Sequence, residues 1–311
     1  MYSMLLLIFV LIGLLIFGLT LMKIGFQTLT EQYIERLESK LSKRNGFLFG
    51  FVMTLLFQSS SVSIAMLMTF IGSMKRSIPF ILCYLIGANI STTLTTQLFV
   101  WNNDVLMIGC LIVGFIFVLL PFKHYSWFSI GAVLLGIGVI FATLNGFGNL
   151  THALSMSQID AWLESPDTSP FQLLFSGFAI TAILQSSTTF TALLIGFIED
   201  GPILLHHILY LIVGANLGTC ITVLFFSIGQ SQLAKLVAYS HIAINSVGLL
   251  LVLTFPLLFE TYMIDVITNM ITSIEQQIVF IALFYNIIIG LVILIFLKPF
   301  ASFMKLFYKP T

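Results

Sequence analysis

The chain has 311 residues, of which 59% are hydrophobic and only 8% charged, and its twelve Lys and Arg are balanced by twelve Asp and Glu. Soluble domains carry about 25% charged residues, so this composition excludes a water-soluble enzyme, and the lack of a basic surface excludes nucleic acid as a partner. Long apolar runs recur along the chain, each near the ~20 residues that cross a bilayer as a helix. We therefore expect an all-α, multi-pass protein of the cell membrane, surrounded by the lipid bilayer.

Nine apolar segments stand out, at residues 4–22, 46–72, 78–100, 105–122, 127–147, 171–198, 203–228, 233–256 and 277–297. The first lacks the positive flank and the small-residue cleavage site of a signal peptide, so it is expected to remain as a helix. Between the first two segments, Leu29, Tyr33, Leu37 and Leu41 recur every four residues, which predicts an interfacial helix. The polar stretch 149–169 is expected to be a looser connector.

An internal repeat organises the chain. Residues 50–99 align with residues 177–226 without a gap, with 18 identities in 50 positions. Two polar motifs recur at the same spacing: QSSS faces QSST, and GANIST faces GANLGT. Compositional similarity between membrane helices explains scattered Leu matches, but it does not explain two polar motifs at identical spacing, so we infer a duplication.

The positions of the charges predict the topology. If the two segments that carry QSS (46–72 and 171–198) dip into the membrane and return to the same side, all twelve Lys and Arg fall on one side. The positive-inside rule favours this arrangement, with about seven crossings, two hairpins, the N-terminus outside and the C-terminus inside. Each repeat then crosses an odd number of times, so the two repeats are inverted, as in many secondary transporters. We assign 1–125 to repeat 1, 126–256 to repeat 2, and 257–311 to a final helix with a short basic tail.

Dense polar clusters lie inside the apolar segments of both repeats. In helices, isolated Ser and Thr commonly bond to their own backbone carbonyls, but these clusters contain Gln and recur at the same depth, which favours a substrate site. A second half-helix beginning at each QSS tip, with Ser near its N-cap, would aim backbone N–H groups at an anion. We expect the GAN segments to break in the same way at Gly87 and Gly214, leaving carbonyl oxygens for an alkali cation.

No charged side chain lies in the middle of an apolar segment. A multivalent anion there requires balance by dipoles and co-bound cations, which favours sodium coupling over a proton relay. It also argues against an enzyme, because a membrane phosphatase needs a nucleophile or base beside a cationic clamp. His241 and Asn245, one helical turn apart, are equally consistent with a supporting role behind the site and with a satisfied core pair.

The paired QSSS and QSST motifs, each followed about thirty residues later by GAN-[IL]-x-T, resemble the type II sodium–phosphate cotransporter family over roughly residues 10–250. AxxHxxxN at Ala238, His241 and Asn245 is similar to a segment that follows the second repeat in that family. The chain departs from the family pattern at Ser91, where the usual residue is glycine, which repeat 2 keeps at Gly218. It also lacks the C-terminal soluble domain of many bacterial members, so it resembles the short bacterial form of the plasma membrane.

The resemblance implies symport of inorganic phosphate with sodium ions, with Na+ as coupling ion and sole metal and with no cofactor. It implies the following phosphate-binding residues: Gln58, Ser59, Ser60, Ser61, Gln185, Ser186, Ser187 and Thr188. It implies the following sodium-binding residues: Ser63, Asn89, Thr92, Thr93, Thr189, Asn216 and Thr219. The alternative function is a sodium-independent anion channel or phosphate exporter that uses the same site.

Overall fold

The computed structural model describes residues 2–41, 46–74, 77–119, 125–154, 165, 168–198 and 204–307, and over these ranges it contains helices and no strands. Six helices are long and apolar enough to cross a membrane. They are α1 (Tyr2–Leu41), α4 (Ile78–Val100), α6 (Tyr125–Leu154), α10 (Leu205–Ser227), α11 (Gln232–Thr254) and α13 (Ile274–Ile295). With the shorter apolar helix α5 (Asp104–Leu119), the described chain accounts for the seven expected crossings, and the all-α membrane fold is confirmed.

The two QSS segments each form a sharply bent helix pair, as the sequence predicts. In repeat 1, α2 (Gly46–Phe57) and α3 (Ser60–Met74) are bent by 120° within the described part of the pair. In repeat 2, α8 (Pro170–Leu184) and α9 (Ser187–Phe197) are bent by 119°. Two bends of the same size at equivalent positions reflect the same local chemistry in both repeats.

The bent pairs are held by close crossings with α4 and α10. A Cβ atom on Gly50 of α2 would overlap the backbone of Tyr84 in α4, and one on Gly177 of α8 would overlap the backbone of Leu211 in α10. Only a glycine permits this approach, because without a side chain the two backbones come into direct van der Waals contact. The two crossings are equivalent in the repeats, and they fix where each hairpin tip lies.

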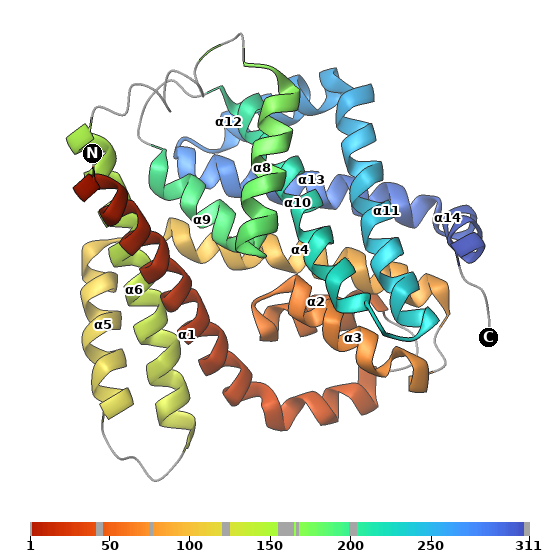
Figure 1. Ribbon diagram of the computed structural model, residues 1–311, viewed down its shortest axis with the longest axis horizontal. Coiled ribbons are helices and arrows are strands. Elements are labelled where there is room, and N and C mark those ends of the chain that lie inside the picture. The colour runs from red at the N-terminus through yellow and green to blue at the C-terminus, as the bar shows by residue number, and fades with distance from the viewer. Residues whose placement is uncertain are drawn as a thin grey trace.

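Helices α1, α5 and α6 pack together at one side of the molecule (Figure 1). Within α5 only Gly114 is buried, whereas Val105 is 83% exposed. Such apolar exposure is unfavourable in water but suits contact with lipid tails. The first turns of α1 and helix α14 (Leu297–Met304) lie at opposite sides of the molecule (Figure 1), as an odd number of crossings requires.

Three segments differ from the expectations. The stretch predicted as a separate interfacial helix continues α1, which bends and ends at Leu41 (Figure 1). The expected connector 149–169 is helical up to Leu154 because α6 continues, and much of the rest lies outside the described residues. After residue 256 the chain forms a π-helix (Leu257–Met263), α12 (Ile264–Met270), α13, α14 and a 3₁₀ turn (Lys305–Phe307). The predicted basic tail is therefore helical to Phe307.

Candidate functional site

Each hairpin tip turns at a glutamine with an unusual backbone conformation. Gln58 has φ 51° and Gln185 has φ 57°, and among the described residues they are the only non-glycine residues with positive φ. This left-handed conformation costs a non-glycine residue about 1 kcal/mol or more. It ends the first half-helix, and the backbone N–H of Gln185 donates to the Thr181 carbonyl at 2.7 Å.

The serine after each glutamine starts the second half-helix. Ser186 is the N-cap of α9, and its Oγ accepts a hydrogen bond from the Thr189 N–H at 3.2 Å. Ser59 accepts in the same way from the Val62 N–H at 3.4 Å. These bonds satisfy donors that a helix N-terminus leaves unpaired. The expectation that a Ser near the N-cap follows each tip is confirmed.

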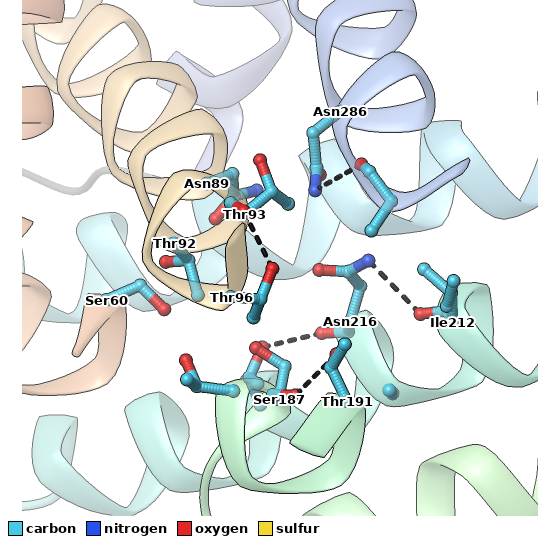
Figure 2. A pocket seen from close by; sticks show the side chains of 14 residues that line it. Ser60, Asn89, Thr92, Thr93, Thr96, Ser187, Thr191, Ile212, Asn216 and Asn286 are labelled. Atoms are coloured by element: carbon cyan, nitrogen blue, oxygen red, sulfur yellow. Dashed lines mark hydrogen bonds between the residues drawn. The ribbon is translucent and has the colours of Figure 1, made fainter. Parts of the chain in front are cut away.

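The start of each second half-helix reaches one small enclosed cavity between the repeats (Figure 2). The cavity measures about 20 Å³, which is room for one water-sized species. Fourteen residues line it: Ser60, Asn89, Thr92, Thr93, Thr96, Ser187, Thr188, Thr191, Ile212, Ala215, Asn216, Thr219, Ala282 and Asn286. None of these fourteen is charged, and eleven carry a hydroxyl or an amide.

The lining combines equivalent residues of the two repeats. Three pairs related by the repeat face the cavity: Ser60 with Ser187, Asn89 with Asn216, and Thr92 with Thr219. The tips of the inverted hairpins thus share one cavity with α4 and α10, as the repeat predicts.

Seven of the eleven polar residues around the cavity donate a side-chain hydrogen bond to their own helix. Thr96 Oγ1 donates to the Thr93 carbonyl at 2.7 Å, and the Asn216 and Asn286 amide nitrogens donate to carbonyls four residues earlier, each at 3.1 Å. Thr92, Thr93, Thr191 and Thr219 are back-bonded in the same manner, at 2.6–3.0 Å. Because the hydroxyl hydrogens of these threonines bond carbonyls of their own helices, their oxygens remain as acceptors, as do the amide oxygens of Asn216 and Asn286. Figure 2 shows Asn89, Asn216 and Asn286, from three helices, around the same space as Thr92, Thr93 and Thr96.

Eight of the fifteen binding residues named from the sequence line this cavity, and seven do not. Gln58 is buried, and its Nε2 donates to the Leu55 carbonyl at 2.6 Å, whereas Gln185 is exposed. Ser63 is bound to the hydroxyl of Tyr84 at 2.6 Å, which gives it a packing contact between α3 and α4. The remaining residues outside the lining are Ser59, Ser61, Ser186 and Thr189.

The GAN segments do not break, so that expectation is wrong. Helices α4 and α10 run continuously through Gly87 and Gly214. A Cβ on Gly87 would overlap the Phe47 carbonyl, and one on Gly214 the Leu174 carbonyl. These glycines therefore permit close helix crossing, and the carbonyls near them remain inside the helical hydrogen-bond ladder.

His241 and Asn245 lie behind the cavity, on α11, and both are buried. The Asn245 amide donates to the His241 carbonyl at 3.0 Å and to Cys220 Sγ at 3.4 Å. Cys220 follows Thr219, a lining residue, so the pair contacts the helix that carries the site and not the cavity itself.

Sequence reasoning did not identify Asn286 of α13, which is 5% exposed and lines the cavity. The signal was present, because Asn286 is the single amide within the apolar run 278–297. It lies outside the repeated segment, however, so comparison of the repeats does not find it.

Comparison with known proteins agrees with this architecture. The family model described as Na+/Pi-cotransporter matches twice, at residues 14–149 and 145–262, so each repeat matches it separately. "Uncharacterized protein YqeW" of Bacillus subtilis is 30% identical over 284 residues, which cover 87% of this chain and 89% of that protein.

More distant relatives carry a functional name. "Putative inorganic phosphate export protein YjbB" of Escherichia coli K12 is 25% identical over 301 residues, covering 94% of this chain. Its Salmonella typhimurium counterpart is 23% identical over 304 residues, covering 96% of this chain. The chain spans about half the length of each, since the matches cover 54% of both relatives. No solved structure matches the chain.

The family model matches each repeat, and the structure bends both QSS segments into helix pairs. Both findings agree with the resemblance to sodium–phosphate cotransporters that the paired QSS motifs indicate. The protein is a multi-pass membrane transporter of phosphate and not an enzyme. The chain belongs to the Na+/Pi-cotransporter family.

Proposed function

We propose that the protein couples phosphate transport to sodium by symport, through alternating access of the cavity between the two repeats. The observation that carries this proposal is the orientation of the lining groups. Five threonines and two asparagines line an uncharged cavity while donating to carbonyls of their own helices, which leaves their oxygens as acceptors. Such acceptor oxygens are ligands for a hard cation such as Na+.

The anion requires donors, and these come from the hairpins. The second half-helices α3 and α9 begin at this cavity with Ser60 and Ser187. Their first backbone N–H groups and positive dipole ends favour an anion. Residues Gln58–Ser61 and Gln185–Thr188 are proposed as the phosphate-binding groups on this basis.

Charge balance is the reason for coupling. No charged residue lines the cavity, and an unbalanced phosphate at the membrane centre would be very costly. Sodium ions on the acceptor oxygens would supply the missing positive charge, so anion and cation affinity depend on each other. Since about 20 Å³ is too small for a phosphate ion, the hairpin tips must separate to admit it.

A second candidate is a sodium-independent phosphate exporter. It is favoured by the name of the Escherichia coli relative, "Putative inorganic phosphate export protein". An exporter would use the same anion-binding tips but would not need the acceptor oxygens to hold a cation.

Uptake of radiolabelled phosphate into proteoliposomes separates the two. We expect saturable uptake with an inward sodium gradient and little uptake with potassium. Phosphate flux of equal size in both gradients would overturn the symport and support the exporter or a channel. Absence of flux with either cation would contradict both.

A further inference from the structure

A second cavity lies next to the first, toward the side predicted to face outward. It measures about 570 Å³ and is largely polar. Twelve residues line it: Phe99, Val100, Asn102, Asp104, Leu144, Asn145, Gly148, Asn149, Ile195, Gly196, Ile198 and Glu275. In its wall, Asn102 Nδ2 donates to Asn145 Oδ1 at 2.5 Å, and Asn145 Nδ2 donates to the Asp104 carboxylate at 3.2 Å. A polar opening of this size admits water and hydrated ions.

Three helices connect the two cavities. Helices α4, α9 and α13 line both of them and contact one another in pairs. On α4 the last residue of the small cavity is Thr96 and the first of the large one is Phe99. On α9 the corresponding residues are Thr191 and Ile195. At 1.5 Å per residue these steps correspond to about one helical turn each, or roughly 5 Å.

Buried apolar side chains on α4 and α9 form a layer between the two cavities. Phe99 is 1% exposed and Ile195 is 7% exposed, and both line the large cavity. A hydrated ion cannot cross a packed apolar layer without losing its water. The layer therefore separates the large cavity from the proposed ion site.

The two glutamine tips differ in a way that agrees with closure on this side. Gln58 lies at the tip of the hairpin that enters from the opposite side, and it is 4% exposed. Gln185, its equivalent in repeat 2, is exposed. Two equivalent residues in inverted repeats have different access when a transporter is closed on one side only.

We propose that the large cavity is the outer vestibule of the transport path and that Phe99, which lines it together with Ile195, is its gate. The vestibule delivers ions and phosphate to the small cavity when Phe99 moves away. This inference rests on the proposed function, because a gate has meaning only if the small cavity is the transport site.

The vestibule is tested with a cysteine at Gly148, in a chain whose native Cys83, Cys110 and Cys220 are replaced by alanine. Gly148 lines the vestibule, and nothing lies within 4 Å of the Cβ that a substitution would add. We expect Gly148→Cys to transport, and a bulky, membrane-impermeant methanethiosulfonate added from outside to block transport at least tenfold.

Gly109→Cys is the matched control. Gly109 also has nothing within 4 Å of an added Cβ, but it lies on the exposed face of α5 and lines neither cavity. The same reagent should leave its transport unchanged. Complete modification of Gly148→Cys with full transport would overturn the vestibule.

The gate is tested by the reaction rate of Thr96→Cys with the same reagent, in membranes free of sodium and phosphate. Beneath a closed gate this cysteine should react at least tenfold more slowly than Gly148→Cys, and adding Phe99→Ala should restore the rate. Equal rates with Phe99 intact would overturn the gate, and so would a rate unchanged by Phe99→Ala. Because labelling requires no transport, a failed uptake experiment would contradict the proposed function without altering this readout.

Discussion

At the scale of single residues, Gln58 and Gln185 combine two properties that are rarely found together. Each adopts a positive φ that favours glycine, and each keeps a long amide side chain at a hairpin tip. Glycine would adopt this positive φ at a lower conformational cost, because it has no Cβ atom. We infer that the side chain is retained for its chemistry, at a cost in conformational energy.

Glycine substitution separates the two properties. In Gln58→Gly and Gln185→Gly the strain at φ 51° and φ 57° is relieved, so the melting temperature in detergent should be equal to or above that of the parent. Phosphate transport should fall to background, because the amide is lost. Gln→Ala at the same positions should also stop transport but lower the melting temperature. Transport at the parent rate in both glycine variants would remove these side chains from the site.

The threonines of the cavity offer a second test at this scale. Thr96→Val keeps the shape of the side chain but removes an oxygen that faces the cavity. Loss of one ligand to a charged species costs about 1.5–3 kcal/mol, so the sodium concentration for half-maximal uptake should rise about tenfold or more.

Thr143→Val is the matched control for this variant. Thr143 is also buried, and its Oγ1 donates to the Val139 carbonyl at 2.7 Å, but it belongs to α6 and does not line the cavity. Its sodium dependence should equal that of the parent chain. An equal shift in both variants would show that the threonines act through general stability.

At the scale of elements, glycines position the hairpins by allowing backbones to touch. Gly214 in α10 faces the Leu174 carbonyl of α8, and Gly87 in α4 faces the Phe47 carbonyl of α2. The neighbouring atoms are backbone, so they cannot rotate away from an added methyl group. The helices would have to separate, and the tip would move with them.

Gly214→Ala should therefore destabilise the protein by about 1–3 kcal/mol or more, the usual cost of overpacking, and lower its melting temperature in detergent. Gly109→Ala, on α5, has open space around the added methyl and should stabilise its helix by up to about 1 kcal/mol. Opposite shifts in melting temperature are expected. A neutral Gly214→Ala would contradict the crossing.

At the scale of the whole molecule, the fold places two inverted hairpins around one cavity and keeps ionised groups out of it. Asp104, Lys235 and Glu275 lie in the first turns of α5, α11 and α13, where the membrane surface can solvate their charges. Large apolar side chains are exposed between Leu6 and Ile24 of α1 and between Val105 and Leu119 of α5, which suits contact with lipid tails. This division of polarity allows a polar site to exist at the centre of a bilayer.

The inverted topology predicts which loops face the same side. Thr272, between α12 and α13, should face outward, and Gln230, between α10 and α11, should face inward; both are exposed. In the background without native cysteines, an impermeant maleimide added to intact cells should label Thr272→Cys. It should label Gln230→Cys only after the cells are opened. The reverse pattern would invert the assigned orientation.

The sequence by itself determined the membrane class, the duplication and the two hairpin tips. These features depend on local chemistry, because a Gln-Ser pair inside an apolar run both breaks a helix and caps the next one. It also identified the pairs Ser60 with Ser187, Asn89 with Asn216, and Thr92 with Thr219, since repetition at one spacing distinguishes them from scattered polar residues.

Only the tertiary structure decided how those segments meet. From the sequence, Gly87 and Gly214 are predicted to break their helices. In the structure they lie against the backbones of α2 and α8, so they are the points where these helices cross. Asn286 joins the cavity from a helix outside the repeat, and Phe99, one turn beyond Thr96 on α4, lines the larger cavity. Such roles depend on which helices lie side by side, and packing between segments far apart in the chain leaves no periodic signal in the sequence.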